Sequence, residues 1–263
     1  MPKLVQDVLA ICSDPKASVR QLAERVKVDE ALSSRILRIV NSAYYGFHRE
    51  IGNVDHALVV LGFEEVKNIA LAACIIHAYP YESDRVFNRE KFWMHSLCTA
   101  YTARALRKYV PEIISQDAFV IGLMHDFGKV VLSQLFHNHF IRSVTEAGKQ
   151  NRSLHQVELE FADLNHAEVG GRVCEGWELP PALTRAVEFH HNPEEAYAHE
   201  YSIHLAHLAN YFSHRANIGN SGNPVPDNVS LVSINAFGIQ NEDLDEVWQS
   251  LGVDTDAIRT MIV

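Results

Sequence analysis

Helical periodicity runs through almost the whole chain, and it constrains the fold more than any other feature of the sequence. Near the N-terminus, Leu4, Val8 and Ile11 place apolar side chains on one face of a helix. Alternation of apolar and polar residues, which would indicate a strand, is not sustained anywhere. The sequence therefore predicts an all-α fold.

Capping and stop signals divide the first part of the chain into short helices. Asp14-Pro15 ends the first helix, because the residue before a proline is driven out of the α region. Ser18 opens the next helix, with Gln21 as its capping-box partner. We expect a five-helix bundle over about residues 3–80. Its further helices are predicted at Ala31–Val40, from an Asn53 cap to Leu61, and at Glu64–Ala78.

A second helical bundle is expected after the polar, proline-containing stretch Tyr79–Asn88, which we interpret as a boundary. This HD-like bundle would span about residues 88–214, followed by a C-terminal helical extension over about 227–263. We expect one two-lobed domain over residues 1–263. Helices are predicted at Arg89–Tyr109, from Gln116 through Met124 after a break at Pro111, from near His125, and at Phe140–Gly148, Ser153–Phe161, His166–Trp177, Pro181–His191, Tyr201–His214, Glu242–Leu251 and Thr255–Ile262, with a loop at Gly219–Asn228.

Composition narrows the class of protein. A chain of 263 residues, 47% hydrophobic and 21% charged, can bury one large core or two small ones. Its net charge of −10 disfavours non-specific binding to nucleic acid or anionic lipid. The cysteines form no CxxC pair, the N-terminus lacks a basic segment followed by an apolar run, and no uncharged stretch reaches about 18 residues. We therefore expect a cytoplasmic protein that does not span a membrane.

Six residues in helical stretches are of the types that bind divalent transition metals. Imidazole nitrogen and carboxylate oxygen are ligands of iron, manganese and zinc. A lone histidine is more often a packed or exposed residue than a ligand, so the prediction depends on the group as a whole. The six residues are His95, His125, Asp126, His166, His190 and His191.

The segment Met124–Lys129 suggests what such a site could do. If a helix begins here, His125 and Lys129 lie on one face and Asp126 lies about 100° around it, so all three can address one cleft. Gly128 lowers helix stability unless it permits close approach of another helix or a ligand. A lysine beside bound metal places an ammonium where a phosphate oxygen could bind, which is the electrostatic equipment of phosphoryl chemistry.

Taken in order, these motifs resemble the HDOD domain family. The resemblance covers most of residues 3–213, and the combination is more specific than any single motif. The stretches that carry it are Lys3-Leu4, Ser18–Leu22, Leu32–Leu37, Asn41–Gly46, Ala57–Gly62, Phe92–Ser96, Gly122–Lys129, Asn165–Gly170, Phe189–His191 and His204–Asn210.

The resemblance implies an all-α fold and a role in bacterial signalling or regulation, in most members without demonstrated catalysis. HDOD domains are related to HD-type metal phosphohydrolases and to HD-GYP phosphodiesterases of cyclic di-GMP. In catalytic relatives, positions that match the six residues hold two metals, Lys129 matches a phosphate-side lysine, and the position of Asn210 is an aspartate. Val130–Phe136 stands where the GYP signature would follow, which argues against hydrolysis of cyclic di-GMP.

Asn210 should weaken the implied metal site. Among the matched ligands only Asp126 then carries negative charge, so hydroxide, phosphate or another anion must balance the rest of the charge of two divalent cations. An amide oxygen can coordinate a metal, but more weakly than a carboxylate. We expect reduced metal affinity, with one or two ions of iron, manganese or zinc bound.

Three functions stay open from the sequence. The first is a regulatory module that contacts signalling proteins, favoured by the missing acid and the missing GYP stretch. The second is a metal-dependent phosphohydrolase or phosphodiesterase acting on a nucleotide or another phosphate-containing ligand, with Asp126 and Lys129 as catalytic residues.

The third function is nucleic-acid binding through residues 18–40, which have the look of a helix-turn-helix. Residues 16–49 hold seven basic residues against three acidic ones. Against this function, Val28-Asp29 replaces the usual glycine turn and the chain as a whole is acidic.

For protein partners, Tyr44–Phe47 is the most suggestive surface, because tyrosine supplies a large contact area at a low entropic cost. Packing between the two bundles is the simpler explanation of these aromatic residues.

Overall fold

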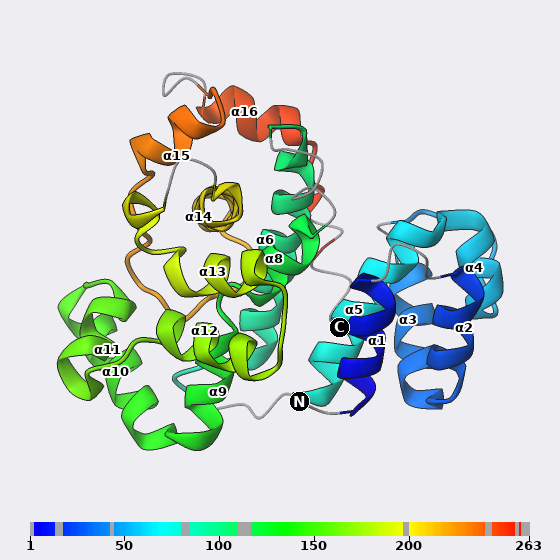
Figure 1. Cartoon of the computed structure of the whole chain (residues 1–263), viewed down its shortest axis with the longest axis horizontal. Helices are drawn as coiled ribbons and strands as arrows, with labels where there is room; N and C mark the ends of the chain where they lie inside the picture. The colour runs from blue at the N-terminus through cyan, green and yellow to red at the C-terminus, as the bar shows by residue number, and fades with distance from the viewer. Residues whose placement is uncertain are drawn as a thin grey trace. The chain divides into compact units, whose positions relative to one another are not determined.

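The computed structural model describes residues 3–13, 18–42, 45–79, 85–109, 117–196, 200–239, 244–255 and 258. Helices cover most of these residues and no strand occurs among them, which confirms the predicted all-α fold (Figure 1). The chain divides into two compact units, residues 1–80 with 254–263, and residues 81–253.

The first unit is built from short helices with defined caps. Ser18 and Gln21 form the predicted capping box, and the Asn53 side chain accepts a hydrogen bond from the His56 backbone N–H. Asp29 accepts from the Leu32 backbone N–H, so an N-cap takes the place of a glycine turn here. The helices are α1 (Lys3–Ser13), α2 (Val19–Lys27), α3 (Glu30–Val40), α4 (Val54–Leu61) and α5 (Phe63–Ala78).

The aromatic segment that was predicted as a partner surface is partly packed. The rings of Tyr45 and Phe47 stack with their centroids 6.2 Å apart, and both residues are half-buried. The Tyr45 hydroxyl donates to Glu65 on α5 at 2.6 Å. Tyr44 lies outside the described residues, and the role of this segment in binding partners stays a prediction.

The second unit gathers longer helices around a large apolar core. Helix α14, seen end-on in Figure 1, packs against α6, α8 and α13, and α12 packs against α9 and α13. Trp93, Phe119, Phe127 and Phe212 are among the largest fully buried side chains. The elements are α6 (Arg89–Leu106), η1 (Arg107–Tyr109), α8 (Ala118–Met124), α9 (Phe127–Leu135), α10 (His137–Gln150), α11 (Leu154–Ala162), α12 (His166–Gly176), α13 (Pro181–Phe189), η2 (Pro193–Glu195), α14 (Tyr201–Arg215), α15 (Leu231–Ala236) and α16 (Leu244–Leu251).

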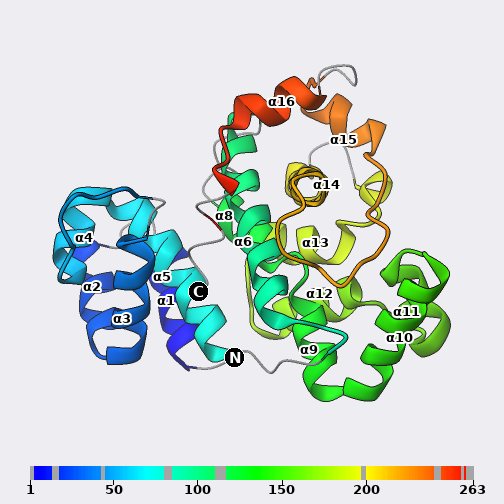
Figure 2. The same cartoon turned by 180° about the vertical axis from the view of Figure 1, so that it is seen from behind.

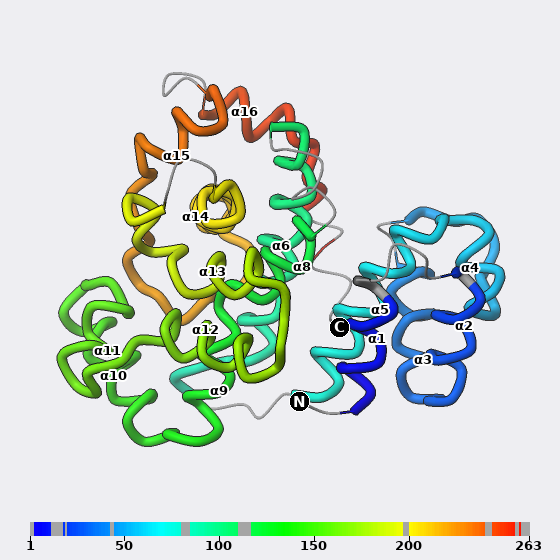
Figure 3. Tube along the Cα trace, in the orientation of Figure 1, coloured from blue at the N-terminus to red at the C-terminus, as the bar shows by residue number. Residues whose placement is uncertain are grey.

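Two short helices, η2 and α15, are not predicted by the sequence pattern. Each is too short to show a helical period, and α15 forms behind a local cap in which the Ser230 side chain accepts from the Ser233 backbone N–H. The tube in Figure 3 shows α10 and α11 side by side, as their packing requires. The break predicted at Pro111 lies outside the described residues, as does most of the helix predicted at Thr255–Ile262.

One stretch of the described residues, Ala118–Leu135, has the length and hydropathy of a membrane-spanning helix, with 18 residues and a mean hydropathy of 1.2. A buried core helix meets the same criterion, and 78% of this stretch is buried inside the protein. The chain also turns at His125-Asp126 between α8 and α9, so the stretch is not one continuous helix.

Gly128 lets α9 cross the beginning of α12 at very short range. A Cβ added at Gly128 would lie 1.8 Å from the carbonyl oxygen of His166 and 2.8 Å from the backbone nitrogen of Gly170. Both obstacles are backbone atoms, so the two helices would have to move apart. The expectation that Gly128 permits close approach of another helix is confirmed, and that approach positions His166.

We predict that Gly128→Ala lowers the free energy of unfolding by roughly 1–3 kcal/mol, because the added methyl forces the helices apart. Gly148→Ala is the matched control, since no heavy atom lies within 4 Å of a Cβ added there on α10. The control should gain up to ~1 kcal/mol from helix propensity. Chemical denaturation monitored by tryptophan fluorescence compares the two variants, and equal stability would contradict the close contact.

Candidate metal centre

All the predicted site residues lie in the second unit, and each is 9% exposed or less. The structure brings them together around the turn between α8 and α9. Because six separate segments contribute, the second unit must be folded for the cluster to exist. The residues are His95 on α6, His125 and Asp126 in the turn, Lys129 on α9, His166 at the start of α12, His190 and His191 directly after α13, and Asn210 on α14.

The Asp126 carboxylate divides the cluster into two halves. Its Oδ1 atom lies 3.1 Å from Nε2 of His166 and 3.5 Å from Nε2 of His190. Its Oδ2 atom lies 2.6 Å from Nζ of Lys129 and 3.3 Å from Nε2 of His125. The two oxygens of this one carboxylate therefore face two different sets of side chains.

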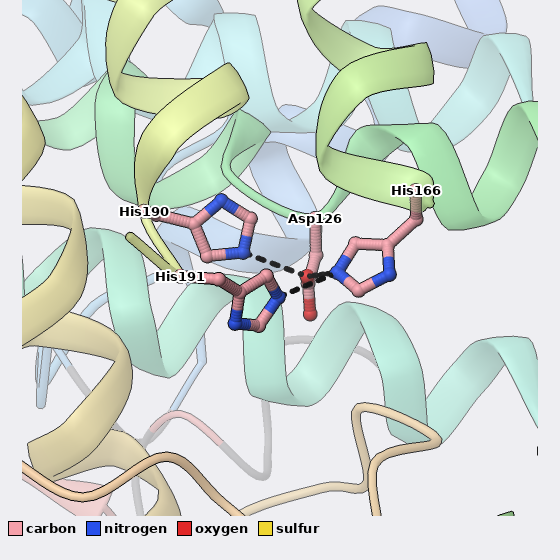
Figure 4. Close-up of side chains that lie close together, drawn as sticks. All are labelled: Asp126, His166, His190 and His191. Carbon is pink, nitrogen blue, oxygen red and sulfur yellow. Dashed lines mark hydrogen bonds and ion pairs between the residues drawn. The ribbon is translucent and has the colours of Figure 1, made fainter. Parts of the chain in front are cut away.

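Three imidazoles and Oδ1 of Asp126 form what we call the three-histidine half: Asp126, His166, His190 and His191. Figure 4 shows the three rings turned toward the same carboxylate. One ligand atom from each residue lies within 4.8 Å of all the others, and the Nε2 atoms of His166 and His191 are 2.8 Å apart. Such convergence of nitrogen and oxygen donors suits a tetrahedral or slightly larger coordination sphere.

The Nδ1 atom of each ring in this half is held by a group outside the cluster. Nδ1 of His166 bonds to Oε2 of Glu158 at 2.6 Å, and Nδ1–H of His190 donates to the Val187 carbonyl at 2.8 Å. Nδ1 of His191 bonds to Asp227. These contacts direct every Nε2 atom toward the centre, and metal-binding histidines are oriented in this way in other proteins.

Unpaired acceptors in the cluster show that the residues fit a metal ion. Nε2 of His125, Nε2 of His190 and Oδ1 of Asp126 are buried without a hydrogen-bond partner among the described residues. Nδ1–H of His125 donates to the Gly122 carbonyl at 2.8 Å and Nδ1–H of His190 donates to the Val187 carbonyl at 2.8 Å, so in the neutral ring of each residue the lone pair is on Nε2. Buried acceptors that face one another destabilise the fold. A cation bound between them would satisfy them together.

The other half, which we call the lysine half, consists of Oδ2 of Asp126 with His95, His125, Lys129 and Asn210. Nε2 of His95 lies 3.0 Å from Oδ1 of Asn210. An amide oxygen can only accept, so this contact places a proton on Nε2 of His95. The buried ammonium of Lys129 already balances the carboxylate on this side. The lysine half is therefore less suited to a second cation.

Charge reinforces the difference between the halves. The carboxylates of Glu158 and Asp227 hold two rings of the three-histidine half, in addition to Asp126 itself. The lysine half has no further carboxylate among its described contacts. A divalent cation is therefore attracted most strongly to the three-histidine half.

Most of the imidazoles are kept neutral by burial. Burial lowers the pKa of His190 to about 4, and burial together with neighbouring imidazoles holds the pKa values of His95 and His191 well below 6.5. His166 behaves differently. Burial lowers its pKa, but the carboxylates of Glu158 and Asp126 outweigh burial and raise it. Without metal, a proton on His166 stands where a cation would bind, and metal binding would release it.

The pKa of Asp126 lies well below its usual range. Burial opposes ionisation of this carboxyl, but Lys129 and His125 outweigh burial. Lys129 was predicted to face a phosphate oxygen, and in the structure its ammonium faces Asp126 instead. Its role as a phosphate ligand therefore stays a prediction that the observed contact does not support.

Several residues that support the cluster are missed by sequence reasoning. The His155 ring stacks on His191 with centroids 4.2 Å apart, Nδ1–H of His207 donates to the His190 carbonyl at 2.9 Å, and the His214 ring lies 4.6 Å from that of His95. Glu158 could have been found, because it interrupts the apolar face of a predicted helix where an unpaired carboxylate would be costly. Asp227 lies in a loop and gives no such signal.

The sequence of this chain matches one protein-family model over more than half of its length. The model of the HDOD domain matches residues 1–193. This chain belongs to the HDOD family. The match ends before Asn210 and Asp227, so two groups that touch the cluster lie beyond the matched stretch of the HDOD domain.

Solved structures support the HDOD fold. An HDOD domain protein of unknown function from Geobacter sulfurreducens is 20% identical, with a TM-score of 0.82 and coverage of 100% of this chain and 91% of that chain. A protein from Shewanella amazonensis, provisionally named a phosphohydrolase, is 21% identical, with a TM-score of 0.77 and coverage of 99% and 93%. At these identities the similarity shows the fold alone.

Two further relatives are longer than this chain. A protein from Marinobacter aquaeolei, provisionally named a signal transduction protein, is 20% identical with a TM-score of 0.83, and the match covers 99% of this chain and 59% of that one. An uncharacterized protein of Treponema pallidum is 24% identical over 200 residues. That match covers 74% of this chain but 38% of the relative, so the chain spans well under half of its length.

The contact between Glu158 and His166 generates a prediction for the metal-free protein. We expect Glu158→Gln to lower the pKa of His166, because the carboxylate that offsets burial is removed. Because the pKa of His166 is raised in the folded protein, protonation of its ring stabilises the fold, most fully below the pKa of the unfolded state near 6.5. The difference in free energy of unfolding between wild type and Glu158→Gln should therefore be largest at acid pH. It should shrink as the pH rises through the folded pKa.

Glu160→Gln is the matched control on the same helix, because Glu160 pairs with exposed Arg152 away from the cluster. NMR titration of the His166 ring measures the shift, and denaturation at several pH values measures the stability. Equal His166 pKa values in the two variants would contradict the assigned contact.

Proposed function

We propose that this chain is a regulatory HDOD module that holds one divalent transition-metal ion in its three-histidine half and acts through contacts with signalling proteins. The observation that carries the proposal is the division of the Asp126 carboxylate. Oδ1 has no hydrogen-bond partner and faces the Nε2 atoms of His166 and His190, of which that of His190 is unpaired. Oδ2 is bound by the Lys129 ammonium.

A single ion follows from charge and ligand count. The three-histidine half offers three nitrogens and one carboxylate oxygen, which suffices for iron, manganese or zinc. In the lysine half, a second ion would have to displace the Lys129 ammonium and accept the neutral oxygen of Asn210. Both requirements weaken binding, since the ammonium repels a cation and an amide is a poorer ligand than a carboxylate.

The same division argues for regulation over hydrolysis. Two-metal phosphoryl chemistry needs ions on both sides of the reacting oxygen and a cation free to bind phosphate. In this cluster Lys129 is 1% exposed and bound to Asp126. The ion accordingly has a structural role, because it would bind residues of α12 and of the end of α13 together with Asp126 in the turn. The name of the Marinobacter aquaeolei protein supports a place in signal transduction.

Metal content distinguishes the two halves. We predict about one ion of iron, manganese or zinc per chain for the protein purified without oxygen, and loss of at least nine-tenths of it in His190→Ala. His95→Ala is the matched control, because it removes a buried histidine from the lysine half only. Elemental analysis of both variants, with circular dichroism to confirm folding, makes the measurement. Two tightly held ions, or equal loss in both variants, would contradict the single-ion proposal.

One observation favours the phosphohydrolase as a second candidate. Nε2 of His125 is unpaired and 3.3 Å from Oδ2 of Asp126, so the lysine half retains part of a donor set. The provisional name of the Shewanella amazonensis protein points to the same chemistry. This candidate requires Lys129 to leave Asp126 when a second ion binds.

A substrate panel separates the two candidates. We predict that nucleotides and phosphoesters incubated with Mn²⁺ or Fe²⁺ release no more phosphate with the wild-type protein than with Asp126→Ala. The reason is that the second ion and the free lysine are both missing. Turnover by the wild type that disappears in Asp126→Ala would refute the regulatory proposal and establish the hydrolase.

A further inference from the structure

A cavity of about 530 Å³ lies beside His95 in the second unit. Helices α6, α10 and α14 and the loop of residues 217–226 form its walls. Its volume falls within the range of small-molecule sites. Among the residues that line it are His95, Val144, His214, Asn217, Ile218 and Asn220.

The described lining of this cavity contains no Asp, Glu, Lys or Arg side chain. Asn217 offers an amide, which both donates and accepts hydrogen bonds. The Asn220 side chain offers its amide N–H groups, because its Oδ1 already accepts from the Gly222 backbone N–H at 2.7 Å. Val144 and Ile218 supply apolar surface, and the imidazoles of His95 and His214, which contact each other with centroids 4.6 Å apart, add ring edges and faces. The cavity therefore combines flat rings, apolar surface and uncharged polar groups.

The loop wall is built into the fold. Gly219 has a φ of 71°, and a Cβ there would lie 2.2 Å from the Lys91 carbonyl oxygen and 2.4 Å from the His95 backbone nitrogen. The Asn220 backbone N–H donates to the same Lys91 carbonyl at 2.8 Å. Figure 2 shows this segment in orange between α14 and α15. Because the loop is anchored to α6, the cavity exists before any ligand binds.

We propose that this cavity binds an uncharged small molecule with a hydrogen-bonding heteroaromatic ring, of the size and chemistry of a nucleoside. The ring would lie against the imidazoles and the apolar wall, and its ring nitrogens and exocyclic groups would pair with the asparagine amides. This inference goes beyond the proposed metal site, since no lining group has to bind a metal for the ligand to bind.

A phosphorylated ligand fits the same cavity poorly. Burying a phosphate without a paired cation carries a large desolvation cost. The described lining offers no such cation, and the net charge of −10 repels anions at long range. The lining therefore selects the nucleoside over its monophosphate.

Calorimetric titration of the full chain as purified tests the proposal. The probes are adenosine, guanosine, cytidine and uridine, each beside its 5′-monophosphate. We expect at least one nucleoside to bind at one site per chain, at least tenfold more tightly than its monophosphate. No binding by any nucleoside, or equal or tighter binding of the monophosphates, would overturn the proposal.

A cavity-filling variant tests the location. Gly148 on α10 lines the cavity and has open space at its Cβ position, so Gly148→Phe should weaken nucleoside binding at least tenfold without disturbing the fold. Gly176→Phe is the matched control, because Gly176 on α12 also has open space but does not line the cavity. Unchanged affinity in Gly148→Phe would overturn the assignment. Since no lining group has to bind a metal for the nucleoside to bind, failure of the metal proposal would not affect the result.

Discussion

The buried carboxylate of Asp126 is the constraint on which the second unit depends. A carboxylate that is 1% exposed must be balanced by positive charge or by donors. Lys129 provides one balance at Oδ2, and the imidazole cluster, with a proton or a metal ion, provides the other at Oδ1. The groups that contact the carboxylate come from α9, the start of α12, the end of α13 and the turn before α9, so packing and charge balance are satisfied by the same arrangement.

This arrangement is consistent with the proposal that this HDOD domain holds a cation in one half of the histidine cluster and none in the other. Glu158 and Asp227 hold rings at Nδ1, and their negative charge favours a cation in the three-histidine half. Asn210 and Lys129 disfavour a cation in the lysine half. A single ion would then cross-link segments that are distant in the sequence. Such a cross-link would make the fold rigid, which suits a module that presents a fixed surface to partners.

Much of the fold follows from local sequence signals, whereas the site follows only in part. The capping box at Ser18, the Asn53 cap and the crossing at Gly128 are local or require only the absence of a side chain, so the sequence predicts them. The gathering of the six candidate ligand residues is implied by the HDOD resemblance. The ammonium of Lys129 pairs with Asp126 three residues away, and helical periodicity does not show that it takes this partner and not a ligand. The contact between Asp227 and His191 joins a loop to the end of a helix 36 residues away in the sequence, which no periodicity encodes.

A crystal structure of the protein grown with Mn²⁺ or Zn²⁺, with anomalous diffraction recorded at the metal edge, tests the central claim most directly. We predict one anomalous peak per chain, bound by Oδ1 of Asp126 and the Nε2 atoms of His166, His190 and His191, with Lys129 still on Oδ2. A second peak between His95 and His125, or no peak in the three-histidine half, would contradict the account.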